Sequence, residues 1–211
     1  EIKLFKPNIR GGNFAMGPDG ALWGNRGMGL VRGMGEKNEI VRIDPETGEV
    51  TDSYPLEKNP VPYQNSVSSD GRFWAGGSPS MTGGNTGMIL DIAKGTMYEV
   101  NSGDILHSAA RGAFEPGGHD AWFGGRDGVL VELVNNIDKN QGVQIRTYTP
   151  PTPYYPFTTF YTAIPDKNDE VWSGILYGRG FVRYNTRTEK WIVYDNAEPS
   201  ALARHTWIDN T

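Results

Sequence analysis

The stretch FAMGPDGALWGN, residues 14–25, decides the fold, because its pattern returns three more times along the chain. Each copy places a turn before a tryptophan and a glycine-rich bend after it. The later copies are NSVSSDGRFWAGG at 65–77, GAFEPGGHDAWFGG at 112–125 and YTAIPDKNDEVWSG at 161–174. The four tryptophans are Trp23, Trp74, Trp122 and Trp172, spaced by 51, 48 and 50 residues. A period of about fifty residues indicates a repeat architecture.

A second hairpin follows the bend in every repeat. In the first repeat, EIVRIDPETGEVTDSYPL at 39–56, Ile40 and Arg42 alternate with Val41 and Ile43, which is the period of a β-strand. The corresponding hairpins cover residues 87–100, 128–148 and 180–195. Asp-Gly pairs at 19–20 and 70–71 are strong signals for tight turns between strands. Each repeat therefore predicts four short antiparallel strands.

Four-stranded repeats of this length predict an all-β fold, a β-propeller, whose blades pack face to face. Helical periodicity is nearly absent from the chain. The predicted blades cover about residues 8–58, 59–103, 104–153 and 154–200. The repeated tryptophan lies near the start of the second strand of each blade. We expect it to fill the gap between neighbouring blades, as a core residue and not as a ligand contact.

The two ends of the chain look like parts of further blades. Residues 1–7 resemble an outer strand, and residues 201–211 resemble an inner strand. We therefore expect a part of a six- or seven-bladed ring, completed by blades outside this sequence or on a further chain. The alternative is that the N-terminal strand closes a small ring of four blades, at the lower end of the known range.

Composition excludes several functions. The 211 residues carry a formal net charge of −5 without a basic block, which argues against non-specific nucleic-acid binding. The absence of cysteine removes disulfides, thiolate metal sites and thiol catalysis. No apolar stretch approaches the ~20 residues of a membrane helix. The absence of cysteine fits either cytoplasm or secretion, and we expect a secreted or periplasmic location. Because the chain starts at Glu1, we expect it to be processed or a fragment.

The segments GPDGALWG and NEIVRIDPETGEVTDSYPL resemble the repeat of the streptogramin B lyase family, the virginiamycin B lyase-like propellers. The first repeat, residues 13–56, carries most of the resemblance. Later repeats match through Asp70-Gly71, their tryptophans and their second hairpins. NHL-type and gluconolactonase-like propellers share much of this pattern, so the resemblance bears on the fold more than on an activity.

The resemblance implies a possible lyase chemistry. The family opens a cyclic depsipeptide lactone by elimination, with histidines, a glutamate and a bound Mg²⁺. Its histidines stand in Pro-His-x-Ile segments, one of them two residues after a glutamate. This chain has Pro62-Tyr63 where Pro-His would stand, and it contains no Glu-x-His sequence. The catalytic set therefore does not carry over.

Two histidines remain candidates for catalysis. His107 and His205 both fall just before a predicted innermost strand, on the face where propellers usually bind ligands. Two imidazoles there would act as acid and base or hold a metal, with Mg²⁺ or Ca²⁺ as the cofactor to consider. The alternative is a pair of ordinary loop histidines. His119 lies in a turn on the opposite face, where we expect it to be solvated.

Candidate ligand-binding residues come from the loops after the repeated tryptophans. Arg26, Arg126 and Arg179 occupy three of these four loops, and Arg32 adds to the first. Converging arginines would clamp a carboxylate or phosphate, so we expect a small anionic ligand there, with Tyr63 as a further contact. The alternative is a set of solvated loop charges.

Two other segments have a functional and a structural interpretation. Residues 150–157, PPTPYYPF, form a rigid apolar edge that would contact a partner or a substrate ring. Alternatively, they form a stiff linker that packs across two blades. Residues 166–170, DKNDE, resemble a loop set of Ca²⁺ ligands but lack EF-hand spacing, which favours a solvated turn.

Two functional hypotheses follow. The first is a non-catalytic propeller that acts as a binding or scaffold module. The second is an enzyme of the streptogramin-lyase-like or lactonase-like kind, with a metal-assisted site at the channel mouth. His107 and His205 would be this chain's contribution to that site.

Overall fold

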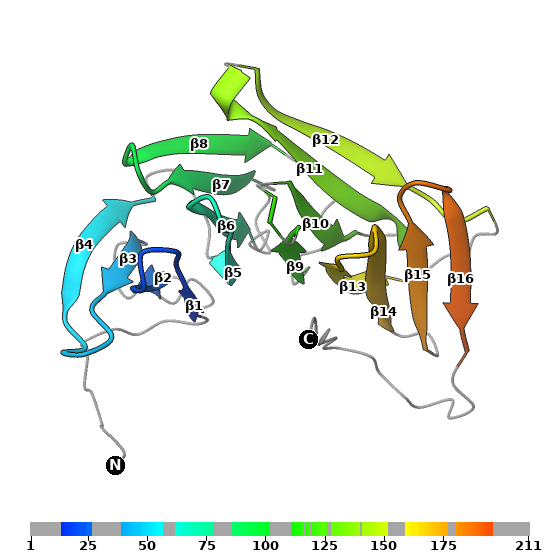
Figure 1. Ribbon diagram of the computed structural model, residues 1–211, viewed down its shortest axis with the longest axis horizontal. Coiled ribbons are helices and arrows are strands. Elements are labelled where there is room, and N and C mark those ends of the chain that lie inside the picture. Colours follow the sequence, from blue (N-terminus) through cyan, green and yellow to red (C-terminus); the bar gives the residue numbers. More distant parts are fainter. Residues whose placement is uncertain are drawn as a thin grey trace, which may run out of the picture. The chain divides into compact units, whose positions relative to one another are not determined.

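The computed structural model consists of short antiparallel strands (Figure 1). It describes residues 14–26, 39–56, 62–77, 86–101, 111–115, 117–118, 120–125, 128–139, 141–151, 159–176 and 180–195. The chain divides into two compact units, Glu1–Asn101 and Ser102–Thr211. Each unit is described below on its own.

The N-terminal unit contains two four-stranded sheets, each with its strands side by side in chain order. The first sheet comprises β1 (Phe14–Met16), β2 (Leu22–Arg26), β3 (Glu39–Ile43) and β4 (Val50–Pro55). The second comprises β5 (Pro62–Val67), β6 (Arg72–Gly77), β7 (Thr86–Asp91) and β8 (Thr96–Asn101). The expected Asp-Gly turns are confirmed, because Gly20 and Gly71 have φ of 77° and 85°, a conformation that glycine adopts without strain.

The C-terminal unit repeats this arrangement twice. Its first four strands are β9 (Arg111–Phe114), β10 (Ala121–Gly124), β11 (Leu130–Asn136) and β12 (Gly142–Tyr148). Its last four are β13 (Thr159–Pro165), β14 (Glu170–Leu176), β15 (Phe181–Asn185) and β16 (Lys190–Tyr194). All described neighbours within a set of four are antiparallel. The longer turn expected near residues 138–142 contains a 3₁₀ turn, Ile137–Lys139.

The two sets of the C-terminal unit are joined where the sequence predicts separate blades. β9 and β13 pair in parallel, with Thr162 opposite Arg111, and this pairing links all eight strands into one sheet. Glycine makes the close approach of β13 and β10 possible. A Cβ atom on Gly124 would lie 2.0 Å from the carbonyl oxygen of Phe160, a distance that no side chain tolerates. The backbone of β13 therefore approaches β10 only because residue 124 is glycine.

Two of the four repeated tryptophans lie in the core, as the sequence predicts, whereas Trp172 is partly exposed and the side chain of Trp74 lies outside the described residues. Trp23 and Trp122 have 0% and 1% of their surface exposed. Trp23, from β2, packs with Leu90 of β7 and with Met88 beside it. Trp122, from β10, packs against the next set of strands, including Val182 of β15. In both places a tryptophan fills the space between one four-stranded set and the next.

Candidate functional site

A carboxylate at the preceding turn accepts the indole hydrogen bond of each repeated tryptophan whose side chain the structure describes. The indole Nε1 of Trp23 donates to Asp19 Oδ1 at 3.1 Å. The indole of Trp122 donates to Glu115 Oε1 at 2.8 Å, and that of Trp172 to Asp166 Oδ2 at 3.3 Å. A buried indole N–H needs an acceptor, since leaving a buried donor unpaired costs about 1–3 kcal/mol. The turn therefore supplies the acceptor that allows the tryptophan to be buried.

The sequence patterns described above do not point to these carboxylates. They precede their tryptophans by four, seven and six residues, because the intervening turns differ in length. A search for an acidic residue anywhere between the first strand and the tryptophan would have found them. In the second repeat this position belongs to Asp70, whose carboxylate accepts a hydrogen bond from the Ser68 hydroxyl.

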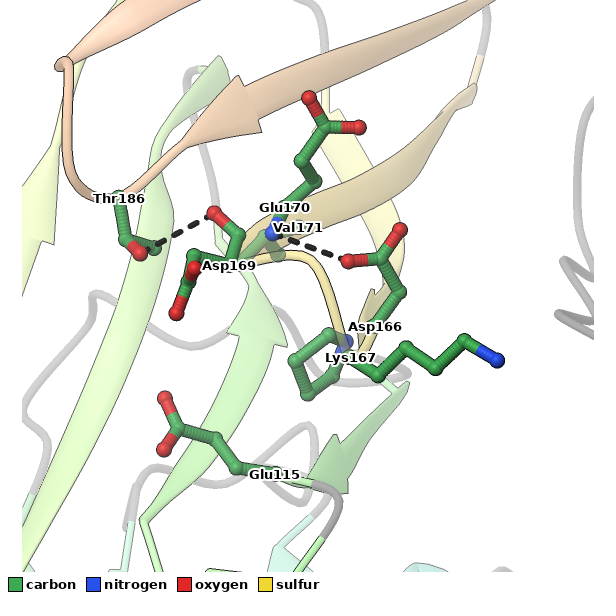
Figure 2. A pocket seen from close by; sticks show the side chains of 8 residues that line it. Glu115, Asp166, Lys167, Asp169, Glu170, Val171 and Thr186 are labelled. Atoms are coloured by element: carbon green, nitrogen blue, oxygen red, sulfur yellow. Dashed lines mark hydrogen bonds between the residues drawn. The ribbon is translucent and has the colours of Figure 1, made fainter. Parts of the chain in front are cut away.

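A small pocket of about 140 Å³ lies beside two of these turns (Figure 2). Four of its lining residues are acidic and one, Lys167, is basic. The lining residues are Glu115, Pro165, Asp166, Lys167, Asp169, Glu170, Val171 and Thr186. Pockets for small organic ligands usually occupy about 300–1,000 Å³. This pocket would admit a single small group at its acidic surface and is too small for a depsipeptide.

The polar groups of the pocket already hold the turn together. Asp166 Oδ1 accepts from the backbone amides of Asn168 at 2.8 Å and Glu170 at 3.1 Å. The hydroxyl of Thr186 donates to the carbonyl oxygen of Asp169 at 3.1 Å, as Figure 2 shows. Asp169 adopts a positive φ of 59° at this turn. The segment 166–170 is therefore the turn between β13 and β14, as the structural interpretation of the sequence predicts.

Glu115 is the most perturbed acid of the pocket. Burial raises the pKa of its carboxyl above the ordinary value of 4.5, and the nearby charges of Asp120, Glu132 and Asp169 raise the pKa further. The hydrogen bond from Trp122 acts in the opposite direction. A half-buried carboxylate among other acids would favour a cationic neighbour. Among the described residues, however, no group of three or more His, Asp or Glu side chains has the geometry to hold a metal ion.

Arg26 is the one predicted site residue whose side chain the structure describes. It ends β2, and its Nε donates to Glu39 Oε2 at 3.0 Å across the β2–β3 pair. Its guanidinium is thus ion-paired within the sheet. Its role toward a ligand stays a prediction, as does that of Tyr63, which lies in β5.

The remaining predicted site residues lie outside the described residues, so their roles also stay predictions. They are His107, His119, His205, Arg32, Arg126, Arg179 and residues 152–158.

One face of the strands β13–β16 carries an aromatic surface that is partly exposed. We call it the Trp172 face; it consists of Trp172, Phe181, Arg183, Ile192 and Tyr194. The strand register places these side chains on one side, since Trp172 lies opposite Arg183, Arg183 opposite Ile192, and Phe181 opposite Tyr194. The rings of Trp172 and Tyr194 stack at 5.6 Å.

Arg183 covers part of this face. Its guanidinium carbon lies 5.4 Å from the centre of the Trp172 ring and 5.9 Å from that of Tyr194. It also forms an ion pair with Glu170 at 3.2 Å. Phe181 and Ile192 nevertheless each keep 41% of their surface exposed. The Trp172 face thus combines aromatic, aliphatic and cationic groups at the surface.

Comparison with known proteins identifies the fold. No family model matches the chain, and no curated protein matches it. Among solved structures, it resembles the WD40 repeats of RRP9 (TM-score 0.60, 14% identity, 89% of this chain and 53% of that chain). It also resembles U3-55K (0.60, 14%, 89% and 54%) and the hydrazine synthase of Kuenenia stuttgartiensis (0.61, 15%, 86% and 48%).

These likenesses show that the chain has a β-propeller fold, the architecture to which WD40 repeats belong. They do not single out the streptogramin B lyase family. The chain spans about half the length of the solved structures that it matches. Among the described residues there is no helix with the length and apolarity that crossing a bilayer requires.

Proposed function

We propose that this chain is a non-catalytic binding or scaffold module within a larger β-propeller of six or seven four-stranded blades. A propeller is a stiff stack of sheets that presents loops and edges to other molecules. The solved structures that the chain resembles are about twice its length, which supports the larger ring. The step from propeller fold to binding function is an analogy with other propellers.

The observation that carries the proposal is the use of the pocket's carboxylates by the framework itself. Glu115 and Asp166 accept the indole hydrogen bonds of Trp122 and Trp172. Asp166 also holds the backbone of its turn. A general acid or base must reach a substrate proton at hydrogen-bond distance. Because these carboxylates already accept hydrogen bonds from indoles and backbone amides, a structural role for them is better supported than a catalytic one.

The partner that we propose is another protein. The pocket of about 140 Å³ is small for an organic ligand, whereas the sheet surfaces display aromatic and charged groups of the kind that protein interfaces use. A small anionic ligand bound by Arg26, Arg126, Arg179 and Tyr63 is the other partner that the sequence suggests. A secreted or periplasmic location stays part of this proposal.

Affinity capture from cells of the source organism, compared between two versions of the bait, tests the proposal. The wild-type chain and a His107→Ala/His205→Ala variant serve as baits, and captured proteins are quantified by mass spectrometry. We expect one or more reproducible partners, enriched to the same extent, within about twofold, by both baits. The double variant removes both imidazoles that an enzyme would use and leaves the described sheets untouched.

Calorimetric titration with Mg²⁺ and Ca²⁺ accompanies the capture experiment. A scaffold should give the same heat with the wild type and with the double variant. Saturable binding of Mg²⁺ that the double variant loses, together with failure to capture any partner, would contradict the proposal. That result would instead support the lyase-like or lactonase-like alternative.

A further inference from the structure

Two interfaces between consecutive four-stranded sets follow one plan. In the N-terminal unit, Trp23 is buried against an aliphatic face of the next sheet. That face consists of Val67, Met88, Leu90, Ile92 and Met97. In the C-terminal unit, Trp122 is buried against the next set, β13–β16. The residues that it meets there include Val171, Val182, Tyr184, Trp191 and Val193. In each case the covering surface includes residues of the first, third and fourth strands.

The Trp172 face occupies the same position in the last described set. Three equivalent rows of paired residues run across the sheets. Each row starts on the second strand, two residues after the tryptophan, and continues through the third and fourth strands. These rows are Asn25–Ile40–Tyr54, Gly124–Leu130–Tyr148 and Gly174–Phe181–Tyr194. Ile40 and Leu130 are both 0% exposed, whereas Phe181 is 41% exposed. The third-strand residue of this row is therefore buried in the first and third sets and exposed in the fourth.

The opposite face of β13–β16 is already occupied. Val182 and Tyr184 point to that side, and both are buried against Trp122 and Leu130. Successive residues of a strand point to alternate faces, so Phe181 and Arg183 point away from this contact. The uncovered surface is therefore the outward face of a sheet whose other face is complete.

The charge of Arg183 does not prevent another sheet from covering the Trp172 face. Arg183 lies opposite Trp172, and Arg42 and Glu132 lie opposite Trp23 and Trp122. Arg42 pairs with Asp19 at 2.7 Å, and Glu132 pairs with Arg146 at 3.6 Å. Each covered face thus includes one charge that is neutralised within its own sheet, as Glu170 neutralises Arg183.

We propose that the Trp172 face is the docking surface for a further four-stranded antiparallel sheet with an aliphatic face, carried by polypeptide outside these 211 residues. The sheet would resemble the face of Val67, Leu90 and Met97 that covers Trp23. This inference rests on the larger propeller proposed above, and it names the surface by which that ring continues. The exposed Phe181 and Ile192 are the groups that the added sheet buries.

A second copy of this chain is not the occupant that we propose. A head-to-tail ring would place the first sheet of one copy on the Trp172 face of another, through the face of β1–β4 that points away from Trp23. Val41 and Ile43 lie on that side of β3, and they are only 0% and 4% exposed. These side chains of the third strand are covered already. The large apolar side chains that the structure describes as exposed on that side, Phe14 at 44% and Met16 at 60%, belong to the first strand, whereas the faces that cover Trp23 and Trp122 also use the third and fourth strands.

Hydroxyl-radical footprinting tests the inference directly. The 211-residue chain and the natural polypeptide, purified from its source as cells make it, are oxidised in parallel, and the side chains are compared by mass spectrometry. We expect Phe181 and Trp172 to be oxidised in the 211-residue chain and at least about fivefold less in the natural polypeptide. Leu130 and Trp122 serve as internal controls, protected in both.

Three results would overturn the inference. The first is equal oxidation of Phe181 in both proteins. The second is a natural polypeptide with the 23.3 kDa mass of this chain alone. The third is protection that appears only as the concentration of the 211-residue chain rises, which would identify a second copy as the occupant. None of these results depends on the capture of a protein partner. The docking surface and the binding function are therefore tested by independent experiments, and either can be refuted without the other.

A pair of variants gives an independent readout. Phe181→Asp places a charge on the proposed interface, and Gln144→Asp places one on an exposed position of β12 as the matched control. In the natural polypeptide we expect Phe181→Asp to lower the melting temperature by about 5 °C or more, and by about 2 °C or less in the 211-residue chain. Gln144→Asp should have the same small effect in both. Equal effects of Phe181→Asp in the two proteins would contradict the inference.

Discussion

The faces around Trp122 and Trp172 have the same construction and different surroundings. Both tryptophans lie near the start of a second strand and donate an indole hydrogen bond to a turn carboxylate. Each tryptophan ring lies against a tyrosine ring of the fourth strand, Tyr148 for Trp122 and Tyr194 for Trp172. The face around Trp122 is buried, whereas the face around Trp172 is partly exposed. Local sequence therefore builds the sheet and its turn, and the neighbouring sheet decides whether the tryptophan joins a core.

The largest difference between the two faces should come from removing the tryptophans. Trp122→Ala should lower the free energy of unfolding by about 3–5 kcal/mol, because it deletes a fully buried ring. Trp172→Ala should cost less than half as much, because water already reaches that face. Urea unfolding followed by circular dichroism measures both values. Equal losses would show that the two faces are buried to the same extent.

Removing one hydroxyl from each face should separate them on a smaller scale. The hydroxyl of Tyr148 donates to Glu132 Oε2 at 2.5 Å, and Glu132 is only 8% exposed. Tyr148→Phe leaves this carboxylate short of a donor and should cost about 1–2 kcal/mol. Tyr194 contributes its ring to the stack with Trp172, so Tyr194→Phe should stay within about 0.5 kcal/mol. A larger loss for Tyr194→Phe would contradict this contrast.

The pH dependence of stability should identify Glu115, the half-buried carboxylate that accepts the indole hydrogen bond of Trp122. Burial raises the pKa of Glu115 above 4.5, so the folded state holds this proton more tightly than the unfolded state does. The contribution of this protonation to stability is complete below the pKa that the carboxyl has in the unfolded state. It is lost as the pH rises through the higher pKa of the folded state. Glu115→Gln cannot ionise and keeps an acceptor for the indole. Its stability relative to wild type should therefore increase between about pH 4 and pH 7.

Unfolding by urea across that pH range measures this effect. Glu46→Gln, at an exposed position of the β3–β4 turn, is the control for loss of one negative charge. A Glu115→Gln difference that stays constant with pH, or that follows the Glu46→Gln difference, would show that Glu115 ionises as it does in water.

The smallest effect should come from the cation above Trp172. Arg183 is partly exposed, stacks on the indole and pairs with Glu170. Arg183→Gln should cost about 0.5 kcal/mol in the 211-residue chain, and the difference from wild type should shrink as salt is added. Thermal unfolding at low and high salt measures it. A cost that is large and independent of salt would mean that Arg183 is buried.

The regular features of this fold were open to prediction because they depend on neighbouring residues. Asp19-Gly20 and Asp70-Gly71 form the expected turns, and the tryptophan period marks the second strand of each set. The propeller fold follows from that period, and the comparisons support it. The likeness to a particular enzyme family had no comparable support, because a shared turn and hairpin pattern describes the framework only.

The candidate site was harder to predict, for two physical reasons. Arg26 looks like a free loop cation in the sequence, but the β2–β3 register places Glu39 opposite it. The turn carboxylates vary in their distance from the tryptophan, and only folding brings Glu115 to the indole of Trp122. The parallel pairing of β9 with β13 and the close approach of β13 to β10 at Gly124 likewise join residues that are distant in the sequence. Contacts between distant residues decide each of these features.

Tryptophan accessibility in solution tests the central contrast most directly. The chain contains six tryptophans, which 5-fluorotryptophan labelling would report as separate ¹⁹F resonances, assigned by single Trp→Phe variants. In the 211-residue chain, the Trp23 and Trp122 resonances should not respond to D₂O or to a soluble paramagnetic agent, and the Trp172 resonance should respond to both. Equal shielding of Trp122 and Trp172, or equal exposure, would contradict the account of one face covered and one left open.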